Sequence, residues 1–128
     1  MLELNLRQAA ARCYAIFCDT AQMKLWLPAL KKLKVASTDD RGRAREATFE
    51  LGESLSYALV YAYDDAALKV RWVPSAGVLD GVSGSAHFEP VNASSCRLVY
   101  SLDSLRGRAP EHEREVAEAF AEFVNAGS

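Results

Sequence analysis

The stretch 82–102, VSGSAHFEPVNASSCRLVYSL, decides the fold. On both sides of a short polar segment, large residues alternate with residues that are small or polar. Alternation with a period of two is typical of half-buried strands. We therefore predict a long strand over Val78–Val91, a turn at Asn92–Ser94 and a second strand over Cys96–Leu102. Gly81 and Gly84 inside the first strand predict a bulge or a strong bend. The stretch is expected to form an antiparallel hairpin with one covered face.

The same alternation appears further upstream. The predicted strands there are Leu2–Leu6, Lys31–Val35, Arg45–Leu51, Leu55–Tyr63 and Leu68–Trp72. From the second of these onward, the connections are tight turns rather than crossover helices. Strands that follow one another in sequence should therefore pair antiparallel.

Three segments have helical periodicity instead. Ala10, Cys13, Tyr14 and Phe17 recur at helical spacing. Asp19 or Thr20 ends this first helix, and a short second helix follows over 21–27 before Pro28. The long third helix is expected to begin near residue 110 and to stop at residue 127. Its apolar stripe is Val116, Ala119, Phe120, Phe123 and Val124.

The order is therefore a strand, two short helices, about six strands and a long helix. A sheet with one apolar face needs a cover, and only the last helix is long enough to lie across it. We predict an α+β fold of the form β-α-α-β6-α, in which an antiparallel sheet wraps around the C-terminal helix. The 128 residues, half of them hydrophobic and a quarter charged, suit a single domain over 1–128.

Charge and cysteine content exclude several classes of function. A net charge of −2 argues against a nucleic-acid-binding protein, which is usually basic. Cys13, Cys18 and Cys96 match no zinc spacing, so we expect them to be reduced and mostly buried, as in a cytoplasmic protein. No Cys/His cluster suits a metal and no glycine-rich phosphate loop is present, so no metal or other cofactor is expected. No apolar run reaches the ~18 residues that a transmembrane helix needs.

The chain resembles the START-like or Bet v 1-like (SRPBCC) superfamily, and within it the bacterial polyketide cyclase/dehydrase-type proteins. The resemblance covers nearly the whole chain and rests on packing patterns. The segments that carry it are Phe17–Asp19 with Met23–Pro28, Gly42-Arg43, Tyr57–Tyr61, Gly84–Pro90 and Cys96–Leu102. Two features depart from the family pattern: the first strand is short, and Ala86 replaces a larger, often aromatic residue.

The resemblance implies a helix-grip fold with a cavity between the sheet and the last helix. Members of the family bind lipids, sterols, quinones, plant hormones or polyketides, and a minority catalyse cyclisation or dehydration. The chain is thus expected to bind a small hydrophobic ligand. Ala86 is expected to widen the cavity locally.

Strand parity selects candidate ligand-binding residues, because residues an even number apart share a face. Those expected to line the cavity are Tyr57, Tyr61, Trp72, Asp80, Phe88 and Tyr100. Phe120 on the last helix joins them, and the family resemblance places Trp26 near the cavity mouth. Each tyrosine has an alternative interpretation as a core residue whose hydroxyl reaches backbone, water or the rim.

Parity also sorts the titratable groups. Arg45 and Asp80 are the inward-facing charges, and each needs a partner or a position near a strand end. His87 would be the natural general base, yet its parity points it to solvent unless a bulge at Gly84 inverts the alternation. The surface position is the alternative that parity favours.

Three hypotheses follow. The leading one is binding of a small apolar or aromatic molecule in the cavity. The second is a cyclase or dehydratase that uses a cavity acid and a tyrosine. The third is a protein-interaction module with a vestigial cavity, in which case a homodimer is expected.

Overall fold

In the computed structural model, which describes residues 2–28, 30–51, 55–75, 82–104 and 109–126, seven strands form one antiparallel sheet. The order across the sheet is β1-β7-β6-β5-β4-β3-β2, so each strand from β2 onward pairs with the next along the chain, and β1 returns to pair with β7. The strands are β1 Leu2–Leu6, β2 Leu30–Thr38, β3 Ala44–Leu51, β4 Leu55–Asp64, β5 Lys69–Pro74, β6 Val82–Asn92 and β7 Ser95–Ser104.

Three helices complete the order that the sequence predicts: α1 Ala10–Cys18, α2 Thr20–Trp26 and α3 Ala109–Asn125. Asp19 separates the first two, and its side chain accepts a hydrogen bond from the backbone N–H of Ala21 at 3.0 Å. An aspartate at this position stabilises a helix start by satisfying one free N–H group. Pro28 lies two residues beyond the end of α2, as the sequence predicts.

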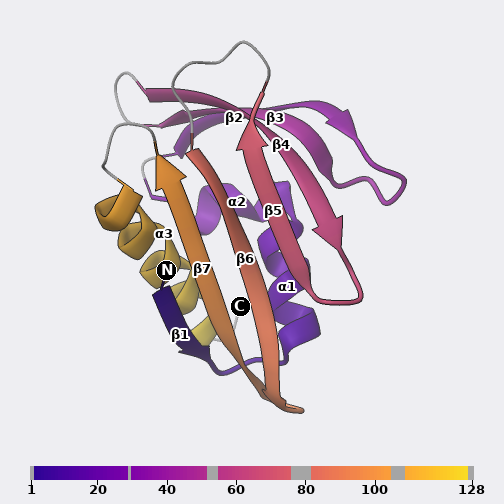
Figure 1. The fold of residues 1–128 in the computed structure, drawn as a ribbon, viewed down its shortest axis with the longest axis vertical. Coiled ribbons are helices and arrows are strands. Elements are labelled where there is room, and N and C mark those ends of the chain that lie inside the picture. Colours follow the sequence, from indigo (N-terminus) through magenta and orange to yellow (C-terminus); the bar gives the residue numbers. More distant parts are fainter. Residues whose placement is uncertain (1, 29, 52–54, 76–81, 105–108, 127–128) are drawn as a thin grey trace.

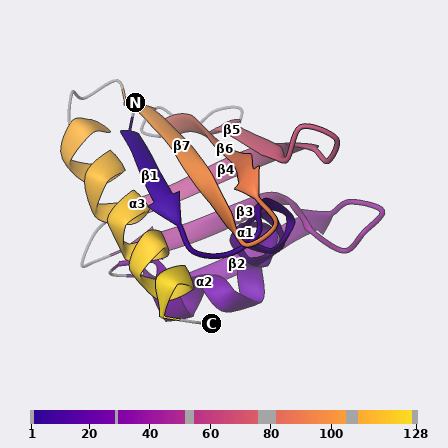
Figure 2. The same ribbon diagram turned by 90° about the horizontal axis from the view of Figure 1, so that it is seen from below.

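The sheet is strongly curved, and the helices lie on its concave side (Figures 1 and 2). Figure 2 shows α3 lying along β1 and β7, and the tertiary contacts of α3 are with β1, β7 and α2. The two short helices cover the rest of the concave face: α1 packs against β6 and β7, and α2 packs against β2. This is the predicted helix-grip α+β arrangement.

Parity holds along the two strands of the opening stretch. Ala86 and Phe88 on β6 and Leu98 on β7 are each 0% exposed, whereas Arg97, between the buried Cys96 and Leu98, is exposed. Full burial of an aromatic side chain such as Phe88 stabilises the fold by roughly 1.5–3 kcal/mol. His87 lies between two fully buried neighbours and keeps partial exposure on the convex face, as its parity predicts.

Of the two alternatives predicted for Gly84, a bulge or a strong bend, the structure excludes the bulge. The glycine pairs with Trp72 on β5 and Leu102 on β7 without a register shift, so no bulge occurs there. A Cβ atom at this position would lie 2.8 Å from Cζ2 of Trp72 and would also collide with the backbone oxygen of Ser101. Glycine is needed here because the indole packs directly over the backbone. The shift in β6 lies instead between Pro90 and Asn92, and Gly81 is outside the described residues.

Arg45 is a correction to the sequence analysis. We expected it to face inward, but it is exposed. Ser37 of β2 pairs with Glu46 and Thr38 pairs with Ala44, so Arg45 is the extra residue of a β-bulge. Ala44 and Ala47 are both buried, three positions apart, because the bulge inverts the alternation between them. The prediction was wrong because parity cannot be counted across an unseen bulge.

A polar network joins α1 to two turns of the sheet. Asp65, between β4 and β5, accepts hydrogen bonds from the Tyr14 hydroxyl at 2.8 Å and from Arg43 at 2.6 Å. Arg43 also pairs with Asp39 at 2.8 Å and lies 4.1 Å from the ring centroid of Tyr63. These contacts fix the β2–β3 and β4–β5 turns against α1.

The three cysteines are free and buried, as the sequence predicts. No group of three or more His, Cys, Asp and Glu suited to a metal ion occurs in the described part of the chain. Among the same residues, no helix combines the length and the apolar character needed to cross a membrane.

Candidate functional site

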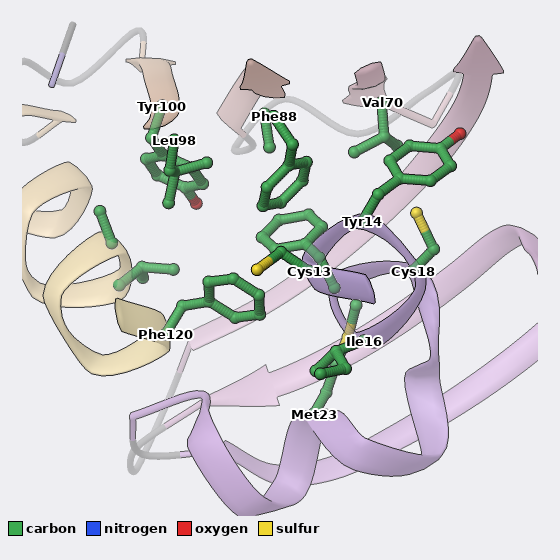
Figure 3. Packing of buried hydrophobic residues seen from close by; sticks show 14 of the residues in the cluster. Cys13, Tyr14, Ile16, Cys18, Met23, Val70, Phe88, Leu98, Tyr100 and Phe120 are labelled. Atoms are coloured by element: carbon green, nitrogen blue, oxygen red, sulfur yellow. The ribbon is translucent and has the colours of Figure 1, made fainter. Parts of the chain in front are cut away.

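Phe17 on α1 lies at the centre of an aromatic cluster between the sheet and the helices. Its ring centroid lies 5.3 to 6.3 Å from five other rings, those of Trp26, Trp72, Phe88, Tyr100 and Phe120. All six side chains are buried. Figure 3 shows the rings of Phe88 and Phe120 between the strands and α3, close to Tyr100. Five of the predicted site residues are therefore in direct contact with one helical side chain.

The sequence analysis missed this role of Phe17. It identified Phe17 as part of the apolar stripe of α1, which is correct, but the stripe alone does not tell which strands it contacts. That depends on where α1 crosses the sheet, and the structure places it against β6 and β7. Tyr14 belongs to the same stripe, yet Figure 3 shows its hydroxyl turned away from Phe88 and Phe120.

Trp26 lies deeper than the family resemblance suggested. Its side chain is 6% exposed, and its ring lies 4.9 Å from that of Phe120 at an interplanar angle of 75°. Its Nε1 is buried and has no hydrogen-bond partner among the described residues. Buried polar groups are hydrogen-bonded in the large majority of cases, so this unpaired donor needs an explanation.

Tyr61 and Trp72 continue the aromatic surface along the concave face towards β4. The ring centroids of Tyr61 and Trp72 are 6.2 Å apart, and those of Trp72 and Tyr100 are 5.7 Å apart. Beyond them, Tyr63 stacks on Tyr61 at 6.1 Å with nearly parallel rings. The predicted tyrosine face therefore exists for the three tyrosines whose side chains the structure describes.

The hydroxyls of these tyrosines fall into two groups. That of Tyr63 donates to the backbone oxygen of Ala44 at 2.6 Å, so it supports the core interpretation. Those of Tyr61 and Tyr100 form no hydrogen bond with a described residue. Burial raises the pKa of Tyr61 well above its ordinary value, and the nearby phenols of Tyr63 and Tyr100 raise it further. Both free hydroxyls are therefore neutral donors at physiological pH.

Glu113 is the buried charged residue of α3 in the described part of the chain. Its side chain is 8% exposed, and Oε2 accepts a hydrogen bond of 2.9 Å from the backbone N–H of Leu102. Burial raises the pKa of Tyr100, and the negative charge of Glu113 raises it further. Glu113 was not among the site residues that the sequence singled out. Its spacing of seven from Phe120 is the signal that could have placed it on the buried face.

Two predicted site residues are not tested by the structure. Asp80 lies outside the described residues. Tyr57 lies on β4 and its backbone pairs with Phe49, but its side chain is outside the described part. The assignments of the remaining residues to ligand binding stay predictions.

The described interior thus offers a particular chemistry. Its side chains are mostly aromatic, and its polar atoms without a described partner are the indole N–H of Trp26, which donates, and the hydroxyls of Tyr61 and Tyr100, which donate and accept. Its described charged group is the Glu113 carboxylate, held by a backbone N–H. Such a surface suits a flat, uncharged molecule that stacks on rings and carries few polar atoms.

Neither a protein-family model nor a curated protein matches the sequence. Several solved structures match over nearly the whole chain. A START superfamily protein from Mycobacterium smegmatis matches with a TM-score of 0.81 at 16% identity, over 99% of this chain and 97% of the other. Norcoclaurine synthase from Thalictrum flavum matches with a TM-score of 0.72 at 15% identity, over 99% and 86% of the two chains.

A third match is the di-domain ARO/CYC StfQ from the steffimycin biosynthetic pathway, with a TM-score of 0.75 at 10% identity. It covers 97% of this chain and 44% of StfQ, so this chain spans less than half of that protein. At these identities the matches show the fold alone. Together with the curved seven-stranded sheet and its C-terminal helix, they establish that the chain has the START-like, or Bet v 1-like, helix-grip fold.

Proposed function

We propose that the domain binds a small apolar or aromatic molecule, of the lipid, quinone or polyketide kind, in an enclosed space between the concave face of the sheet and its helices. The residues that would contact it are Tyr61, Trp72 and Tyr100 on the sheet, with Trp26 and Phe120 on the helices. The residues Tyr57, Phe88 and Asp80 complete the predicted set. The protein would act in the cytoplasm, where its thiols stay reduced.

The observation that carries this proposal is the aromatic surface on the concave face. Tyr61, Trp72 and Tyr100 follow one another there, with neighbouring ring centroids 6.2 and 5.7 Å apart. Tyr61 keeps partial accessible surface, although it lies on the face that the helices cover. An aromatic surface that is covered and not fully packed would suit a flat apolar ligand.

The solved structures that share the fold support the same class of ligand. The norcoclaurine synthase structure contains dopamine and hydroxybenzaldehyde, both small aromatic molecules. StfQ belongs to a biosynthetic pathway and is described as an ARO/CYC protein. The aromatic walls described above have the chemistry that such molecules need.

Fluorescence titration with N-phenyl-1-naphthylamine, a neutral apolar probe, tests the proposal. We expect saturable binding with one probe molecule per chain. Tyr61→Trp should weaken binding about tenfold or more, because it adds bulk on the concave face. The control is Val73→Trp, which adds bulk on the convex face of the next strand, where Val73 is 52% exposed.

We expect the control variant to bind like the wild-type protein. If the wild type shows no saturable binding, the proposed function is wrong. It is also wrong if the two tryptophan variants weaken binding equally while circular dichroism shows both to be folded.

A second candidate function is catalysis of the cyclase or dehydratase kind. The observation that favours it is the position of the buried Glu113 carboxylate, which accepts from the N–H of Leu102, two residues from Tyr100 on β7. A carboxylate and a neutral phenol are a base and an acid that could move a proton on a bound carbonyl compound. Comparing turnover of a linear poly-β-ketone by the wild type and by Tyr100→Phe tests it. Catalysis predicts that the variant loses turnover and keeps binding.

A further inference from the structure

We propose that the indole N–H of Trp26 donates a hydrogen bond to an uncharged carbonyl oxygen of the bound molecule, so that the ligand class is narrowed to aromatic or polyunsaturated ketones. This inference rests on the proposed function, since it requires a bound ligand. It specifies the protein atom and the ligand group that would form the hydrogen bond.

The first step is that the donor is buried and free. Nε1 of Trp26 has no partner in the described part of the chain, and the whole side chain is 94% buried. An indole nitrogen only donates, so the missing partner must be an acceptor. A buried unpaired donor is costly, and a ligand acceptor would remove that cost on binding.

The second step concerns the neighbours of the indole. Its ring contacts are with Phe17 at 5.4 Å and Phe120 at 4.9 Å, and neither side chain carries a polar atom. The face of Phe120 can act as a weak acceptor, because the two rings meet at 75°. That arrangement is the structural alternative, and the experiment below separates it from the proposal.

The third step is the charge of the ligand. Among the described residues, no Lys, Arg or His side chain is buried, so an anionic acceptor would lose its hydration without gaining a positive partner. The phenols of Tyr61 and Tyr100 are further donors on the same concave face. The polar groups that the site presents therefore favour an acceptor without charge, and a ketone or quinone oxygen meets both conditions.

The test uses two ligands of nearly the same shape, 2-acetylnaphthalene and 2-ethylnaphthalene, which differ in a carbonyl group. Their dissociation constants are measured by calorimetry with the wild type and with Trp26→Phe. The phenyl ring retains an aromatic surface but has no N–H. For each ligand, the dissociation constant for the variant is divided by that for the wild type. The greater water solubility of the ketone therefore cancels from the comparison.

We expect Trp26→Phe to weaken binding of the ketone about tenfold more than binding of the hydrocarbon. An equal loss for both ligands would overturn the proposal and leave the proposed function intact. Failure of both ligands to bind the wild type would instead contradict the proposed function.

A second readout does not depend on the folding of the variant. In ¹H–¹⁵N spectra of the wild type, the indole N–H signal of Trp26 should move downfield with the ketone and not with the hydrocarbon. The second tryptophan of the chain, Trp72, provides an internal reference signal. If the Trp26 signal stays unchanged with the ketone bound, the N–H is held by the Phe120 ring and the proposal is wrong.

Discussion

The carboxylate of Glu113 on α3 accepts a hydrogen bond of 2.9 Å from the backbone N–H of Leu102 on β7. Among the described residues, β1 pairs with β7 from Cys96 to Tyr100, so Leu102 has no described partner on β1. The helix supplies an acceptor for this N–H. This contact ties the gripped helix to the sheet beside the aromatic cluster.

We predict that Glu113→Ala lowers the free energy of unfolding by about 1–3 kcal/mol, because it leaves the buried N–H of Leu102 without its acceptor. Glu113→Gln should cost less, since an amide oxygen can still accept. Urea denaturation measures both. Glu115→Ala, at an exposed position of the same helix, is the control and should change stability by less than about 0.5 kcal/mol. Equal losses at the two glutamates would contradict the role assigned to Glu113.

Phe17→Ala should destabilise the fold by about 3–5 kcal/mol, because it removes a ring that contacts five others and leaves a cavity among them. Thermal and urea unfolding measure the loss. Leu25→Ala is the matched control, since Leu25 on the neighbouring helix is 65% exposed. A loss below about 1 kcal/mol for Phe17→Ala would show that the cluster is not the centre of the core.

Asp65→Asn should reduce stability in a manner that depends on pH. Hydrogen bonds from Arg43 and from Tyr14 lower the pKa of Asp65 below its ordinary value of 3.8. A carboxylate with a depressed pKa stabilises the folded state above the unfolded-state pKa, and that contribution is lost as pH falls through the folded-state pKa.

The stability difference between the wild type and Asp65→Asn should therefore be full at pH 6 and should shrink as pH falls below about 4. Urea denaturation at a series of pH values measures it. Asp40→Asn, in the exposed β2–β3 turn, is the control, and its stability difference from the wild type should not decrease in this way. A stability difference between the wild type and Asp65→Asn that stays constant down to pH 3 would contradict the stabilising role of the ionised Asp65.

The native thiols should react slowly with Ellman's reagent at pH 8. Burial raises the pKa of Cys13 and of Cys18 to about 12, and it also raises the pKa of Cys96. The thiolate is the reactive species, so raised pKa values and burial act in the same direction. Guanidinium should release three reactive thiols per chain. A thiol that reacts within seconds in the native protein would be evidence against the buried positions.

Much of the architecture could be predicted because local patterns carry it. The alternation of Ala86, Phe88, Leu98 and Tyr100 predicts the strands and the face that each presents, and the structure confirms both. It also places His87 on the convex face. The fold follows because a sheet with one apolar face must be covered by the long amphipathic helix.

The remaining features depend on pairing between distant segments. Arg45 was expected to face inward because no local signal marks the bulge between β2 and β3. Gly84 was expected to form a bulge or a strong bend; no bulge occurs there, and the glycine accommodates the indole of Trp72 on the neighbouring strand. Glu113 was not singled out, because its acceptor role appears only when α3 is placed against β7.

The most direct test of the central claim is the NMR spectrum of the protein titrated with N-phenyl-1-naphthylamine. We predict that ring signals of Tyr61, Trp72 and Tyr100, on the concave face, shift together and saturate with one equivalent of probe. Methyl signals of Val73 and Val99, on the convex face of the same sheet, should stay in place. Shifts confined to the convex-face methyl groups, or shifts that never saturate, would contradict binding inside the helix-grip fold.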